Sequence, residues 1–221
     1  MKKYIILVFA LVLLLVGCNK TDNKYAEAFK KDYESLNGEV NKMGKEHRTV
    51  NIDSDNPFEE ITASELLEKI ENKETFYVYF GDKLCPWCRS VIEKAIEVAD
   101  EKDIDKIYYV AIWDDEGNEI VRDKYELVDG KLEKTIEGCK EYSKLLKYFD
   151  KVLKDYNVKD EDGNEISTGE KRIYAPNFIY VKDGKTIRLT TGISEKQQDS
   201  REELTKEILE DEEELFEEFF K

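Results

Sequence analysis

Two cysteines separated by two residues, in Cys85-Pro86-Trp87-Cys88, are the part of the chain best suited to chemistry. Thiols at this spacing can close a disulfide across one helical turn. The unpaired N–H groups and the dipole of a helix N-terminus also stabilise a thiolate on the first cysteine. Pro86 suits the first position of a helix, where a missing N–H costs nothing. The motif therefore predicts a dithiol–disulfide redox site.

The residues around the motif predict a strand that ends there and a helix that begins there. Residues 75–81 are β-branched and aromatic, as in a buried strand, and residues 85–99 carry apolar side chains at helical spacing. Thr62-Ala63-Ser64-Glu65 predicts a capping box at the start of another helix. We further expect helices over residues 25–36, 63–70, 140–155 and 201–220, strands over 49–52 and 107–113, hairpin turns at Asp129-Gly130 and Asp183-Gly184, and a polar loop over 160–171.

A strand after Tyr174-Ala175-Pro176-Asn177 completes a familiar order of elements. The thioredoxin fold has the same order of elements, namely strand, CxxC helix, strand, helix, X-Pro strand, hairpin strand and terminal helix. Residues 60–220 match this order. The chain resembles thioredoxin-like lipoproteins, with some similarity to bacteriocin-transport accessory proteins. The resemblance implies an α/β fold with a central mixed sheet flanked by helices. An N-terminal extension would cover 25–58, and the domain 59–221 would carry insertions at about 114–138 and 159–172.

The resemblance also implies roles for individual residues. Cys85 matches the attacking cysteine, Cys88 the resolving cysteine, and Pro176 the cis proline that lies beside the disulfide. A cis bond before Pro176 would turn the backbone groups of Ala175 toward an incoming peptide, and Trp87 would contact the same substrate. Pro176 could instead be an ordinary trans proline that opens an edge strand.

Several positions depart from the family pattern. Thioredoxins usually carry Trp before the first cysteine, where this chain has Leu84, and Thr after the cis proline, where it has Asn177. They also carry a buried Asp six residues before the first cysteine, which assists deprotonation of the resolving thiol, and here that position is Tyr79. The Pro-Trp pair between the thiols is closer to glutaredoxin-like sites, although no glutathione site can be read from the chain.

The first residues predict a targeting segment. Lys2 and Lys3 precede an apolar run over residues 4–16, which is too short to span a membrane comfortably and has the length of a signal peptide core. Leu15-Val16-Gly17-Cys18 resembles the lipobox of bacterial lipoproteins. That resemblance implies removal of residues 1–17, a lipid on Cys18, a tether over 18–24 and a position on the outer face of the bacterial cytoplasmic membrane. The alternatives are an ordinary secretory signal or an uncleaved anchor.

Composition limits the other possibilities. The chain has 51 acidic and 35 basic residues, and a net charge of −16 argues against nucleic acid as a partner. Its one histidine, His47, lies in a polar stretch and is expected at the surface, which disfavours Ser-His-Asp and Cys-His hydrolases. Zinc bound through Cys85 and Cys88 would need carboxylates as well. Cys139 is expected to be a half-buried free thiol, with a role as a third redox partner left open.

These patterns together predict a thiol–disulfide oxidoreductase outside the cytoplasm. Its substrates would be protein thiols or disulfides, a redox partner would reset it, and it would need no metal or organic cofactor. We expect a monomer. The alternative is a non-enzymatic surface lipoprotein that uses the same scaffold to bind a partner, with its acidic insertions as the binding surface.

Overall fold

The computed structural model describes residues 23–221 of the protein. The expected signal peptide over 1–17 and the expected lipidation site, Cys18, lie outside the described residues. Among residues 23–221, no helix is both long enough and apolar enough to cross a membrane.

The described residues form a mixed α/β structure with one main sheet. The elements in chain order are α1 (Asn23–Glu34), β1 (Phe58–Glu60), α2 (Ala63–Glu71), β2 (Phe76–Gly81), α3 (Pro86–Glu101), β3 (Ile107–Ala111), β4 (Lys124–Val128), β5 (Lys131–Ile136), α4 (Tyr142–Phe149), β6 (Lys154–Lys159), β7 (Glu165–Arg172), β8 (Asn177–Lys182), β9 (Lys185–Thr190) and α5 (Lys206–Phe219).

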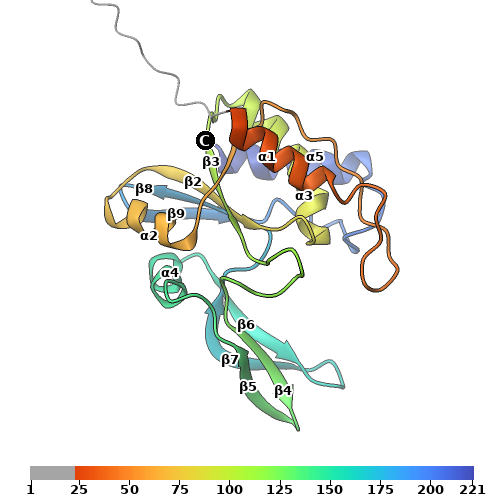
Figure 1. The fold of residues 1–221 in the computed structure, drawn as a ribbon, viewed down its shortest axis with the longest axis vertical. Helices are drawn as coiled ribbons and strands as arrows, with labels where there is room; N and C mark the ends of the chain where they lie inside the picture. The colour runs from red at the N-terminus through yellow and green to blue at the C-terminus, as the bar shows by residue number, and fades with distance from the viewer. Residues whose placement is uncertain (1–22) are drawn as a thin grey trace, which may run out of the picture.

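The main sheet is mixed and is covered by helices on both faces (Figure 1). Its strand order is β1-β3-β2-β8-β9, with β1 and β2 parallel to β3, and β8 antiparallel to both β2 and β9. One buried cluster joins α1, α3 and α5 to the sheet, and a second joins α2 and α4 to it. The expectation of a central mixed sheet flanked by helices is therefore confirmed.

Local signals in the sequence account for several element boundaries. The capping box at α2 is present, since Thr62 Oγ1 accepts from the N–H of Glu65 and the Glu65 carboxylate accepts from the N–H of Thr62. Pro86 occupies the first turn of α3. Asp129 and Gly130 both have positive φ, as a two-residue hairpin turn between β4 and β5 requires.

Two expectations in the region after α4 are wrong. The expected helix over 140–155 ends at Phe149, and residues 154–159 form β6. The expected polar loop over 160–171 contains β7, which pairs antiparallel with β6. Antiparallel pairing between the two segments overrides the helical spacing. In this arrangement Tyr156 on β6 is buried, and the guanidinium of Arg172 on β7 lies over its ring, 4.2 Å from the ring centroid.

Two further boundaries differ from those expected. Residues 49–52 are not a strand, because the backbone N–H and carbonyl of Val50 bond to the side chain of Asn37 instead of to a neighbouring strand. The last helix begins at Lys206 and not at 201, because Thr205 is its N-cap and accepts from the N–H of Ile208.

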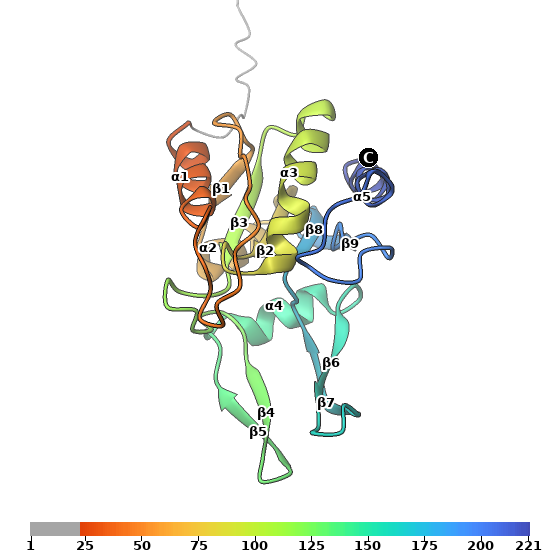
Figure 2. The same cartoon turned by 90° about the vertical axis from the view of Figure 1, so that its right-hand side faces the viewer.

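The β4–β5 and β6–β7 hairpins extend away from the helical part of the molecule (Figures 1 and 2). The first hairpin follows the carboxyl end of β3, and the second precedes the start of β8. Because β3 is parallel to β2 and β8 is antiparallel to it, both hairpins join the sheet at the end where β2 finishes and α3 begins. The CxxC motif lies at this same end of the sheet.

Candidate active site

The thiol pair lies at the N-terminus of α3, directly after the carboxyl end of β2. Cys85 is the N-cap residue of α3, and its Sγ accepts from the backbone N–H of Cys88 at 3.2 Å. Cys85 is 4 % exposed and Cys88 is fully buried, and both are free thiols. One sulfur therefore lies near the surface, with the other directly behind it.

The segment before β8 approaches the first of these thiols. The Cys85 thiol donates to the carbonyl oxygen of Ala175 at 3.6 Å, and the Ala175–Pro176 peptide bond is cis. The alternative of a trans proline at this position is therefore wrong. The structure brings together four of the residues singled out from the sequence, namely Cys85, Cys88, Ala175 and Pro176.

Asn177, where the family pattern has Thr, holds this segment in place. Its Nδ2 donates to the carbonyl oxygen of Pro176 at 2.9 Å, and its Oδ1 accepts from the N–H of Tyr174 at 2.8 Å. These two bonds close a short loop around the cis bond and keep the carbonyl of Ala175 directed at Cys85.

Trp87 lies in the first turn of α3, between the two thiols. It is partly buried and packs against the cluster that contains Cys85 and Cys88. Part of the ring remains in contact with solvent at this end of the helix, and it offers an apolar surface beside the reactive pair.

Burial governs the protonation of the inner sulfur. Burial holds the pKa of the Cys88 thiol well above its ordinary value, and the neighbouring Cys85 thiol acts in the same direction. Tyr79 and the backbone at Asp82 have the opposite, smaller effect on this pKa. Cys88 is therefore a neutral thiol in the dithiol state.

Asp82 fixes the turn between β2 and the motif, and sequence reasoning missed it. Its carboxylate accepts from the backbone N–H of Leu84 at 2.8 Å and from that of Trp113 at 3.4 Å. Burial is the main reason that the pKa of Asp82 rises to about 6. This carboxyl group thus titrates near neutrality, close to the thiol pair.

The sequence suggested Arg89, one residue after Cys88, only as a nearby positive charge, and its burial was not expected. It is fully buried, and its guanidinium donates to the carbonyl oxygens of Tyr33 and Arg48 at 2.7 Å and to Oδ1 of Asn37 at 2.9 Å. All three partners belong to the N-terminal extension. The extension is thereby bonded directly to the active-site helix.

His47 is not at the surface, so that expectation is wrong. It is 6 % exposed, because the segment after α1 folds back against α3 and encloses it. Burial, followed by the nearby charges of Arg89 and Arg201, lowers its pKa. A neutral, enclosed imidazole is consistent with a structural role.

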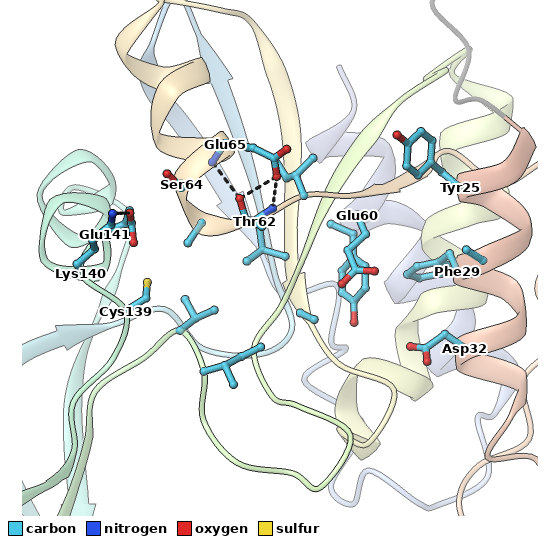
Figure 3. A pocket seen from close by; sticks show the side chains of 18 residues that line it. Tyr25, Phe29, Asp32, Glu60, Thr62, Ser64, Glu65, Cys139, Lys140 and Glu141 are labelled. Carbon is cyan, nitrogen blue, oxygen red and sulfur yellow. Dashed lines mark hydrogen bonds and ion pairs between the residues drawn. The ribbon is translucent and has the colours of Figure 1, made fainter.

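A separate cavity of about 690 Å³ lies between α1, the sheet and the start of α2 (Figure 3). Tyr25, Phe29 and Asp32 line it from α1, and Cys139 lines it from the opposite side. Cys139 is half-buried, as expected, and burial raises its pKa. Neither thiol of the CxxC motif lines this cavity, and Cys139 packs against the cluster under α2 and α4, whereas Cys85 and Cys88 belong to the cluster under α1, α3 and α5.

Within residues 23–221, no group of three or more His, Cys, Asp or Glu side chains is arranged to hold a metal ion. No model of a known protein family matches the chain, and no curated protein matches it. The geometry around Cys85 is therefore the main guide to function.

Proposed function

We propose that the protein is a thioredoxin-like thiol–disulfide oxidoreductase that acts on protein substrates through Cys85 and Cys88. The observation that carries the proposal is the arrangement of four groups at the carboxyl end of the central strand, β2. A nearly buried thiol caps a helix, a fully buried thiol lies behind it, and the Ala175 carbonyl with cis Pro176 lies beside it.

The order of the elements supports a thioredoxin fold for this arrangement. From β2 onward the chain runs through α3, β3, α4, β8, β9 and α5, with the two projecting hairpins inserted before α4 and before β8. This is the order expected from the sequence for that fold, and the cis proline begins the strand next to β2.

The reaction needs only the two thiols. In the reducing direction the Cys85 thiolate attacks a substrate disulfide, whose S–S bond breaks and leaves one substrate sulfur bonded to Cys85. Cys88 then attacks Cys85, the bond to the substrate breaks, and the substrate leaves with the electron pair of that bond. The proton lost by Cys88 balances the charge of the departing thiolate. The same steps in reverse oxidise a substrate dithiol.

The proposal includes a location. A lipid on Cys18 would hold the protein on the outer face of the bacterial cytoplasmic membrane, where its substrates would be exported proteins. A redox partner would restore the reactive state, and no organic cofactor is needed.

Covalent trapping in cells of the native host tests the proposal. Cys88→Ser removes the resolving thiol, so substrates should accumulate as mixed disulfides on Cys85 and be released by a reductant. The double variant Cys85→Ser, Cys88→Ser should trap nothing. Cys139→Ser added to Cys88→Ser is the matched control and should leave trapping unchanged, because Cys139 lies at the separate cavity.

The absence of adducts with Cys88→Ser, together with alkylation of Cys85 no faster than that of a free thiol, would overturn the proposal. A non-enzymatic scaffold that binds its partner through the projecting hairpins would then be the better description.

A further inference from the structure

The loop that follows α1 exposes two large apolar side chains. Met43 is 76 % exposed and Val40 is 61 % exposed, and no other large apolar side chain of residues 23–221 reaches half exposure. Apolar side chains left in water add nothing to the stability of the fold, and a group of them on a surface marks a contact with another molecule. The loop therefore calls for an explanation other than stability.

Val40 and Met43 form one wall of a groove of about 410 Å³. Trp113 and Gly117, from the loop after β3, form the other wall, and Leu84 also lines the groove. This volume lies within the range of about 300–1,000 Å³ that is usual for binding pockets. The groove is therefore large enough to take up a large side chain of a partner.

Hydrogen bonds fix the shape of both walls. Oδ1 of Asn41 accepts from the backbone N–H groups of Met43 at 2.9 Å and Lys45 at 3.0 Å. The Lys42 ammonium donates to the backbone carbonyl oxygen of Glu116 at 2.7 Å and so joins the two loops. Figure 2 shows the loops side by side, between α1 and the β4–β5 hairpin. The groove is therefore formed in advance of any binding.

The groove is continuous with the candidate active site through Leu84, which directly precedes Cys85. The Asp82 carboxylate accepts from the N–H of Leu84 and from that of Trp113, and thus connects two lining residues. A Cβ atom on Gly117 would lie 3.6 Å from Cδ1 of Leu84. An extended peptide advances about 3.3–3.6 Å per residue. A substrate bonded to Cys85 therefore reaches the groove within a few residues of its own cysteine.

Both walls belong to segments that the resemblance to the thioredoxin fold does not account for. The first lies in the N-terminal extension over 25–58, and the second leads into the insertion at about 114–138. The extension is fastened to α3 by Arg89, whose guanidinium donates to Oδ1 of Asn37 at 2.9 Å, three residues before Val40. The groove is therefore a feature of this chain and not of the shared pattern of elements.

The charged residues of the groove are mostly acidic. Glu39, Asp115 and Glu116 line it, with Lys42 as the only lysine or arginine among the lining residues. Asp115 is paired with Lys83 at 2.7 Å, whereas Glu39 and Glu116 are exposed and keep their charge toward solvent. An apolar groove with a negative rim is complementary to an apolar side chain that has a positive charge beside it.

We propose that this groove binds an apolar side chain of the substrate polypeptide, a few residues from the cysteine that reacts with Cys85. Its acidic rim favours a basic residue beside that side chain. This rests on the proposed oxidoreductase function and deepens it, since it names the kind of protein segment that is captured. Met43 and Val40 act in specificity and take no part in the thiol chemistry. Methionine suits this task, because its unbranched side chain adapts to different apolar partners.

Activated peptides test the groove without a biological substrate. Each is a short peptide whose single cysteine forms a disulfide with a chromogenic aromatic thiol. The Cys85 thiolate attacks the peptide sulfur, the S–S bond breaks, and the aromatic thiolate leaves with the electron pair, because it is the better leaving group. The full chain with Cys88→Ser and Cys139→Ser, here the parent, keeps the product as a mixed disulfide. The same chain with Cys85→Ser gives the background rate.

Two peptides are compared. The leucine peptide carries leucine two residues and arginine three residues from its cysteine, on both sides, and the serine peptide has serine in place of leucine. The parent should react about tenfold faster with the leucine peptide, as a large apolar side chain in a pocket allows. The double variant Val40→Thr, Met43→Gln makes one wall polar at nearly the same volume and should reduce this ratio to about threefold.

Two matched controls accompany these variants. Ile187→Thr changes an apolar side chain that is 48 % exposed on β9 and does not line the groove, so the ratio should stay at the parent value. Glu39→Gln should slow the reaction with the leucine peptide by about twofold, because the rim loses a charge that attracts arginine. Glu133→Gln on β5 removes the same charge away from the groove and should not change the rate.

Equal rate constants for the two peptides in the parent would overturn the proposal, and so would a tenfold ratio that survives Val40→Thr, Met43→Gln. An equal fall of the ratio in Ile187→Thr would also overturn it, because the effect would then not belong to the groove. The aromatic disulfide without a peptide reports on Cys85 alone. Rapid reaction with this reagent but no distinction between the peptides would contradict the groove and leave the oxidoreductase proposal standing, whereas a Cys85 no faster than a free thiol would contradict both.

Discussion

The two faces of the main sheet are built differently. The cluster under α1, α3 and α5 contains as many aromatic as aliphatic side chains, together with both thiols of the motif. The cluster under α2 and α4 is mostly aliphatic, with residues such as Leu66, Ile70 and Leu145 in the interior. Both faces bury apolar surface, but the two thiols of the motif and the hydrogen-bonded hydroxyls of Tyr33 and Tyr79 belong to the first.

The difference shows how one sheet can separate stability from chemistry. Aliphatic side chains gain stability from burial and carry no polar group that must be paired. Tyrosine rings are buried as readily and also bring a hydroxyl, which needs a partner in the interior. On the face beneath α3, the hydroxyls of Tyr33 and Tyr79 are partners of each other. Three variants test this separation, beginning with the largest expected effect.

Leu145→Ala should lower the free energy of unfolding by about 2–5 kcal/mol, because Leu145 is fully buried on α4 and its loss leaves a cavity in the aliphatic face. Unfolding in urea measures this change. Leu215→Ala, at a position that is 37 % exposed on α5, is the control and should cost less than about 0.5 kcal/mol. The rate at which Cys85 is alkylated should not change in either variant. A changed rate for Cys85 in Leu145→Ala would show that the faces are coupled.

On the face that contains the thiols, Glu212 makes the free energy of unfolding depend on pH. It is fully buried on α5, neither carboxylate oxygen has a hydrogen-bond partner among the described residues, and burial raises its pKa from 4.5 to about 8. The folded state therefore holds a proton that the unfolded state loses between pH 4.5 and 8, so stability falls as pH rises through this window.

The free energy of unfolding of the parent protein should fall by about 2 kcal/mol between pH 6 and 8, because the proton that folded Glu212 holds becomes worth less as the pH approaches its raised pKa. Glu212→Gln should remove this part of the pH dependence. Urea unfolding at the two pH values measures it, with Glu213→Gln, an exposed neighbour, as the control. Identical pH profiles for the parent and Glu212→Gln would show that the buried carboxyl is charged in the folded state.

Thr62→Ala should have the smallest effect, a loss of about 1 kcal/mol, because it removes the side chain that caps α2. The free energy of unfolding measures this loss, and Ser64→Ala, which changes an exposed residue of the same helix, should be nearly neutral. Because α2 covers the aliphatic face, the rate at which Cys85 is alkylated should be unaffected. Slower thiol reactions in Thr62→Ala would contradict the separation of the two faces.

Features that depend on neighbours in the chain were predictable from the sequence. The start of α3 at the CxxC motif, the capping box at Thr62 and the turns at Asp129-Gly130 and Asp183-Gly184 all lie where expected. Each of them depends on backbone preferences and hydrogen bonds within a few residues. The approach of Ala175 to Cys85 was also expected, but from the resemblance to a known fold and not from local physics.

Features that depend on pairing between distant segments were not predictable. The segment that forms β6 continues a helical spacing, and only its pairing with β7 makes it a strand. The burial of His47 follows from the return of the extension across α3. The hydrogen bond between Tyr79 and Tyr33 had no signal in the chain.

The amino-acid sequence by itself determined which atoms can react. Two thiols at this spacing lie side by side wherever a strand is followed directly by the N-terminus of a helix, and both elements can be predicted from local sequence. Tertiary structure decided what surrounds them. It placed a hydroxyl from a helix 46 residues away in the chain against Tyr79, in the same buried cluster as both thiols. Contacts of this kind arise from packing across the sheet, and the spacing of residues along a chain carries no record of them.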